Sequence, residues 1–138
     1  MEPVATGQWV LRAFYALNLA GAGNSGVQLL LGPSRPAVVS EWGEAVRPPL
    51  AAAVIGSMFS AASLTSLAGL INPVAFSPIL LFQFVYKTIF FFRSTLPALR
   101  RNRPADRPAI KMGLIFAAYT FVLPWFLPWR RFADTLRG

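Results

Sequence analysis

The chain has 138 residues, of which 55% are hydrophobic and only 13% are charged, and its formal net charge is +8. Soluble domains carry about 25% charged residues, so this composition cannot cover a globular surface with polar groups and indicates a membrane protein. The basic residues gather beside apolar runs, as topology signals do, which argues against nucleic-acid binding. The chain contains no cysteine and no histidine, which excludes disulfides, thiol catalysis, iron–sulfur clusters and the usual haem ligands.

Four apolar stretches each approach the length of about 20 residues that a helix needs to cross a bilayer. They cover residues 8–31, 50–71, 78–97 and 109–129. We therefore expect an all-α, polytopic membrane protein, in which a four-transmembrane-helix bundle forms a single integral membrane domain over residues 1–138. Residues 1–8 include no basic residue, and the stretch that follows is long and rich in glycine. We interpret it as a retained first span rather than a cleavable signal.

The first stretch carries a stripe of small and polar side chains at helical spacing, which we expect to face protein rather than lipid. The stripe consists of Asn18, Gly21, Ser25 and Gln28. The connection that follows, Ser34 to Arg47, alternates apolar and charged residues at spacings of three and four. This spacing predicts an interfacial amphipathic helix after the first span.

The second stretch is rich in alanine and serine, and its small residues fall on one helical face. This face consists of Ala52, Gly56, Ser60 and Ser63. A helix with so little bulk on one side is expected to pack closely against a neighbour.

The third stretch places polar side chains on one face of an otherwise phenylalanine-rich helix. Gln83, Lys87, Phe90 and Ser94 share that face, and Tyr86 lies beside them. Lys87 falls about 13 Å from the start of the stretch, near the middle of a bilayer. An uncompensated ammonium group there costs roughly 2.5–3.5 kcal/mol on insertion scales.

Three interpretations of Lys87 follow from the sequence. In the first, the lysine binds a lipid phosphate, an anionic lipophile or a carboxylate of a partner protein. In the second, it is a structural residue of the bundle interior, bonded to Gln83, Tyr86 and the polar stripe of the first span, and uncharged. In the third, Glu41 or Glu44 folds inward to meet it.

The fourth stretch follows a basic loop and ends in prolines. Pro124 and Pro128 are expected to kink or loosen its last turns, and Trp125 and Trp129 suit the aromatic belt of a membrane interface. The basic cluster consists of Arg100, Arg101, Arg103, Arg107 and Lys111. It either fixes the topology or binds an anionic lipid such as cardiolipin.

Four spans place both termini on one side of the membrane. The loop side carries more Lys and Arg than the side of the termini, which favours periplasmic termini, although the basic tail opposes this assignment. The simplest interpretation of the phenylalanine-rich faces is that they face lipid or pack against other helices. The alternative interpretation is that they contact a bound lipid, a pigment, a quinone tail or a neighbouring subunit.

The sequence offers little for catalysis, for a cofactor or for a metal. It contains no nucleophile–base pair, no paired carboxylates within a span and no phosphate-binding glycine loop. We therefore expect a protein that is not an enzyme. The leading hypothesis is an accessory or assembly subunit of a larger, energy-transducing (photosynthetic or respiratory) membrane complex. The alternative is a small lipid- or lipophile-binding protein or transporter that uses the Lys87 face.

One short run resembles known sequences. Residues 76–87, FSPILLFQFVYK, are similar to the start of the third helix in small, uncharacterised bacterial four-helix membrane proteins. The four-span layout also resembles that of the DoxX-like proteins, whose motifs this chain lacks. The resemblance implies a bacterial inner-membrane protein and carries no assigned reaction.

Overall fold

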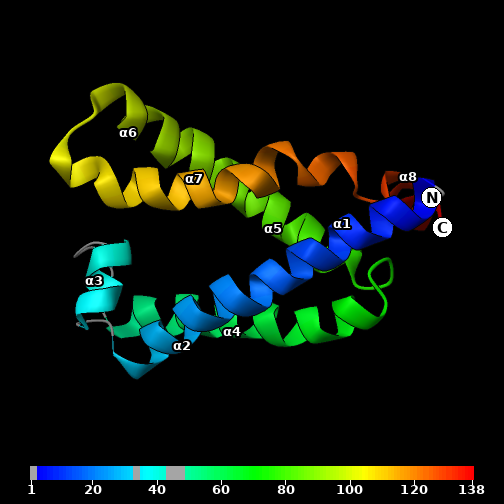
Figure 1. Cartoon of the computed structure of the whole chain (residues 1–138), viewed down its shortest axis with the longest axis horizontal. Helices are drawn as coiled ribbons and strands as arrows, with labels where there is room; N and C mark the ends of the chain where they lie inside the picture. Colours follow the sequence, from blue (N-terminus) through cyan, green and yellow to red (C-terminus); the bar gives the residue numbers. More distant parts are fainter. Residues whose placement is uncertain (1–2, 33–34, 43–48) are drawn as a thin grey trace.

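A computed structural model describes residues 3–32, 35–42 and 49–138, and within these residues the secondary structure is helical, without strands. Four long helices run back and forth along the molecule, so that the two termini lie at the same end (Figure 1). The first long helix consists of α1 (Pro3–Leu17), η1 (Asn18–Ala22) and α2 (Gly23–Leu31), and the second is α4 (Pro49–Ile71). The third consists of α5 (Ser77–Phe90), η3 (Phe91–Thr95) and α6 (Leu96–Arg101). The fourth consists of η4 (Pro104–Asp106), α7 (Arg107–Phe121) and η5 (Leu123–Trp125). Two short helices, α3 (Pro36–Trp42) and α8 (Trp129–Arg137), complete the described chain.

Three of the long helices are apolar enough to cross a membrane. They span Leu50–Ile71, Ser77–Arg101 and Pro104–Trp125, with 22, 25 and 22 residues. The first long helix, which carries several glycines and asparagines, is not among them. The helical architecture and the three apolar helices indicate a membrane protein.

The first long helix packs closely on α4 because small residues meet at their interface. A Cβ atom on Gly26 would lie only 2.7 Å from Ser60 Oγ and 3.0 Å from the carbonyl oxygen of Gly56. Gly21 of the predicted stripe is exposed instead, while Gly23 faces α4. The π-helical turn η1 accounts for this difference, because its wider turn takes up an additional residue and rotates the face that follows.

A second π-helical turn changes the buried face of the third long helix in the same way. Lys87 is buried before η3, but at the end of η3 the buried residue is Thr95, while Ser94 of the predicted face is only half-buried. Thr95 Oγ1 donates a hydrogen bond of 3.1 Å to the carbonyl oxygen of Ala109. Gly113 of α7 lies directly against Thr95, where a Cβ atom would overlap its side chain.

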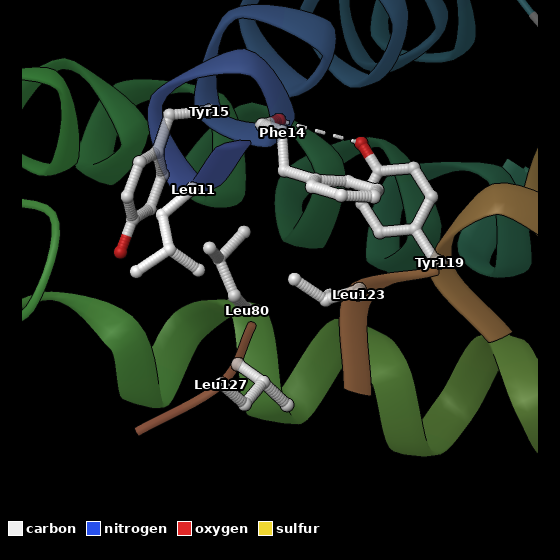
Figure 2. Close-up of a cluster of buried hydrophobic side chains, with 7 residues drawn as sticks. All are labelled: Leu11, Phe14, Tyr15, Leu80, Tyr119, Leu123 and Leu127. Carbon is white, nitrogen blue, oxygen red and sulfur yellow. Dashed lines mark hydrogen bonds between the residues drawn. The ribbon is translucent and has the colours of Figure 1, made fainter. Parts of the chain in front are cut away.

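The main hydrophobic cluster lies toward the end of the molecule that holds the termini, and we call this the core end (Figure 2). It consists of Leu11, Phe14, Tyr15, Leu80, Tyr119, Leu123 and Leu127. The Tyr15 hydroxyl donates a hydrogen bond of 2.9 Å to the carbonyl oxygen of Pro73. Gly69 of α4 leaves room for the Tyr15 ring, which a Cβ atom there would overlap.

The prolines of the fourth stretch stop the α-helix rather than bend it. α7 ends at Phe121, and η5 and a turn follow before α8 begins. The tail, for which the sequence analysis assigned no structure, forms this helix. Its apolar side packs on the bundle through Trp129, whose ring centroid lies 6.2 Å from that of Phe84, while Arg130 and Arg131 are exposed.

The predicted amphipathic helix after the first span is present as α3, at the end of the molecule opposite the termini (Figure 1). Its Val38 is buried against Leu29 and Ala52. The Trp42 ring lies 5.4 Å from that of Phe59 of α4. This helix therefore packs on the bundle; residues 43–47 of the predicted stretch lie outside the described residues.

Candidate functional site

Lys87 lies in the interior of the bundle and is only 4% exposed. Its Nζ atom donates a hydrogen bond of 2.9 Å to Gln83 Oε1, one helical turn earlier. Nζ lies 3.1 Å from the ring centroid of Tyr119, 4.9 Å from that of Phe116 and 5.7 Å from that of Tyr86. Aromatic faces attract a cation most strongly where water is excluded, so these rings offset part of the loss of solvation.

The hydroxyl group of Tyr119 extends the polar contacts of Lys87 to two further helices. It donates a hydrogen bond of 2.6 Å to Asn18 Oδ1, and Asn18 Nδ2 donates one of 3.1 Å to Ser66 Oγ. Asn18 and Ser66 are fully buried. The network joins α7, η1 and α4, so Tyr119 stands between Lys87 and the polar stripe that the sequence analysis placed in direct contact with it.

A cavity of about 560 Å³, which we call the Lys87 cavity, opens beside this lysine. Its walls are mostly apolar and come from α1, η1, α2, α3, α4, α5 and α7. Ser25 and Glu41 contribute polar groups on another wall, where Ser25 Oγ donates a hydrogen bond of 2.7 Å to Glu41 Oε1. Glu41 thus lines the same cavity as Lys87 while its carboxylate binds Ser25; Glu44 lies outside the described residues.

The polar groups at this site have unused hydrogen-bonding capacity. A lysine ammonium group has three donors, and Gln83 is the hydrogen-bond acceptor that the described residues supply to it. Gln83 Nε2 is buried and has no hydrogen-bond partner among the described residues. Buried donors are normally paired, but Gln83 is not among the residues that line the Lys87 cavity, so the donors that can meet a ligand oxygen there are those of Lys87.

Two residues of the predicted polar face lie elsewhere. Gln28 is near the end of α2, where its Oε1 accepts a hydrogen bond of 3.1 Å from Arg35. It therefore does not belong to the polar residues around Lys87. Ser94 is displaced by the π-helical turn η3. Asn18, Ser25 and Tyr86 do lie around the Lys87 cavity or its hydrogen-bond network.

The predicted basic cluster extends from the last turn of α6 to the first turns of α7, at the end of the molecule opposite the termini (Figure 1). Its residues, Arg100, Arg101, Arg103, Arg107 and Lys111, are all exposed. Arg101 forms an ion pair of 2.8 Å with Asp106. The remaining charges face outward, as either a topology signal or a site for anionic lipid requires.

Sequence reasoning missed the buried face of α7 beside Lys87, which includes the aromatic residues Phe116 and Tyr119. Met112, Phe116 and Tyr119 recur at spacings of four and three and are all buried. This periodicity was available in the sequence as a sign of a buried face, but it does not indicate what the face contacts.

The described residues contain no group of three or more His, Cys, Asp or Glu side chains that could hold a metal ion. Comparison with protein-family models, curated proteins and solved structures finds no match. The similarity of residues 76–87 to bacterial four-helix proteins therefore rests on those residues alone. The fold and the site together define a helical protein with three membrane-length helices and a buried lysine beside an apolar cavity.

Proposed function

We propose that this chain is a four-span protein of the bacterial inner membrane that binds a lipophilic molecule with an oxygen acceptor in the Lys87 cavity. The observation that carries the proposal is a buried ammonium group with spare donors at the wall of an apolar cavity of about 560 Å³. Cavities of roughly 300–1,000 Å³ with few convergent polar groups are typical of small-molecule sites. Ionisable residues inside membranes usually mark such sites.

The neighbours of Lys87 support binding by fixing the direction of its ammonium group. Gln83 holds Nζ from one side, and the Tyr119 ring lies under it. The hydrogen bond from Tyr119 to Asn18 keeps that ring in place. Lys87 can then donate to a ligand oxygen while the apolar walls surround the rest of the molecule.

Native mass spectrometry of the gently extracted protein tests this proposal. Lys87→Met keeps the volume and removes the charge. We expect this variant to lose a bound lipophile that the unchanged protein retains, while its thermal stability in detergent is preserved. Lys111→Met is the matched control, because Lys111 is exposed and does not line the cavity. Equal ligand retention by both variants contradicts the proposal.

A second candidate function, an accessory subunit of a larger membrane complex, is favoured by one surface of α4. Ala53, Ser57 and Ala61 are exposed there at spacings of four. Small residues at this spacing let another helix approach closely. Replacement of Ala53 and Ala61 by leucine should then release partner subunits that copurify in mild detergent, whereas purification of the chain alone contradicts this function.

A further inference from the structure

A second cavity of about 330 Å³ adjoins the Lys87 cavity. Both cavities are lined by Phe59, Tyr86, Met112 and Phe116, which we call the aromatic wall. The ring centroids of Phe59 and Tyr86 are 6.4 Å apart, and those of Tyr86 and Phe116 are 6.1 Å apart. The aromatic wall therefore lies between the two cavities and separates them by side chains.

The side chains of the aromatic wall can move without a shift of the helices. Met112 is unbranched and adapts its shape to its surroundings. Phe59 and Tyr86 are only half-buried, because each borders a cavity on two sides. A change of side-chain rotamer at these shared positions is therefore the step that we expect to connect the two cavities.

The two cavities differ in charge. Among the described residues that line it, the Lys87 cavity has one cationic side chain, Lys87, and one acidic side chain, Glu41. Lys87 attracts an anionic head group, and the Glu41 carboxylate repels a head group with two negative charges more strongly than one with a single negative charge. The second cavity has only uncharged residues in its described lining, which beyond the aromatic wall consists of Trp42, Ile55, Met58, Ala62, Phe82 and Phe90.

We infer that the two cavities hold one acyl-chain carboxylate, with its head group at Lys87 and its tail across the aromatic wall in the second cavity. This inference rests on the proposed function, because it requires the Lys87 cavity to bind a ligand. It adds the class of that ligand: a molecule with one carboxylate and one acyl chain. The Lys87 cavity takes the head group, and the second cavity, whose described lining is uncharged, takes the chain.

Photo-crosslinking of the full chain in phosphatidylcholine nanodiscs tests this arrangement. Two palmitate probes are used, one with a photoreactive group beside the carboxylate and one with it at the end of the chain. We expect the head probe to label Phe116 and Tyr119, and the tail probe to label Ile55 and Phe90, which line the second cavity and are half-buried. Predominant labelling of Leu17 and Ile115 by the tail probe overturns the inference. These residues line only the Lys87 cavity and are 52% and 58% exposed at its mouth.

A matched pair of variants sharpens the result. Ala62→Leu places bulk in the second cavity, and Ala53→Leu makes the same change on the exposed face of the same helix. We expect Ala62→Leu to reduce labelling of Phe90 by the tail probe by roughly tenfold, because an overfilled cavity excludes the chain. Labelling by the head probe, and both patterns in Ala53→Leu, should remain unchanged. Equal effects of the two variants contradict the inference.

Competition and the Lys87→Met variant separate the two levels of the proposal. Unlabelled palmitate should displace both probes better than phosphatidic acid does, and the reverse order overturns the assignment of ligand class. If head-probe labelling is insensitive to Lys87→Met, the proposed function itself fails. If that labelling depends on Lys87 while the tail probe stays outside the second cavity, only the present inference fails.

Discussion

The two ends of the helix bundle are packed in different ways. At the core end, seven buried side chains from α1, α5, α7 and the segment after α7 interlock (Figure 2). At the opposite end, which we call the cavity end, α2 packs on α4, and α5 packs with η3 on α7. The space between these pairs holds cavities of about 560 and 330 Å³ and the aromatic side chains that separate them.

The difference originates in the first long helix. Before η1, this helix presents Leu11, Phe14 and Tyr15 to the other helices of the core. After η1, its small residues turn toward α4, so that Gly23 and Gly26 lie against serines of that helix. Little bulk is left to fill the space beside α7. A single wide turn therefore lets one helix contribute to a core at one end and to a cavity at the other.

The largest expected effect contrasts a glycine at each end. Gly69→Ala puts a Cβ atom into the Tyr15 ring, and we expect it to lower the free energy of unfolding in detergent by about 1–3 kcal/mol. Gly21→Ala is the counterpart on the wall of the Lys87 cavity, where an added Cβ atom meets no atom within 4 Å. It should leave stability unchanged or raise it by up to about 1 kcal/mol. Equal destabilisation in thermal unfolding would contradict the contrast between the ends.

A smaller effect is expected at Tyr119, which belongs to the core and also lines the Lys87 cavity. Tyr119→Phe keeps the ring over Lys87 but leaves Asn18 Oδ1 without its donor, so we expect a loss of about 1 kcal/mol. Tyr86→Phe is the control, since the Tyr86 hydroxyl forms no hydrogen bond within the described part of the chain. The thermal unfolding midpoint of Tyr119→Phe should be lower than that of Tyr86→Phe. If the two midpoints coincide, the hydrogen-bond network of Tyr119 and Asn18 does not couple the two ends of the bundle.

The smallest effect should be confined to the cavity end. Ser25→Ala removes the hydrogen bond to Glu41 that holds α3 against α2, a contact worth about 0.6 kcal/mol on average between membrane helices. Hydrogen exchange should become faster in α3 and stay unchanged in α1 and α5 at the core end. Ser40→Ala, at an exposed position of α3, is the control. Exchange that changes equally in both variants would exclude this role for Ser25.

Much of the helical framework could be predicted from the sequence, because helix length and apolarity are local properties. The apolar stretches at 50–71 and 78–97 correspond to α4 and to the helix from Ser77 to Arg101. The register within the helices was less predictable. Ser94 and Gly21 were assigned to packed faces on a regular 3.6-residue period, which each π-helical turn interrupts.

The candidate site could be predicted only in part. Lys87, Gln83 and Tyr86 were recognised because they are close together on one helix, where spacing alone brings side chains together. Phe116 and Tyr119 were missed because they come from another helix, and their contact with Lys87 depends on how two helices are rotated against each other.

By itself, the sequence determined the membrane character of this protein, its long helices and the presence of a lysine on an apolar helix. These properties follow from composition and from periodicity along one chain segment. Only the tertiary structure decided that Tyr119 lies between Lys87 and Asn18, and that a cavity opens beside them. The physical reason is that these contacts join different helices, so they depend on how neighbouring helices pack and are rotated against one another, and not on periodicity along one segment.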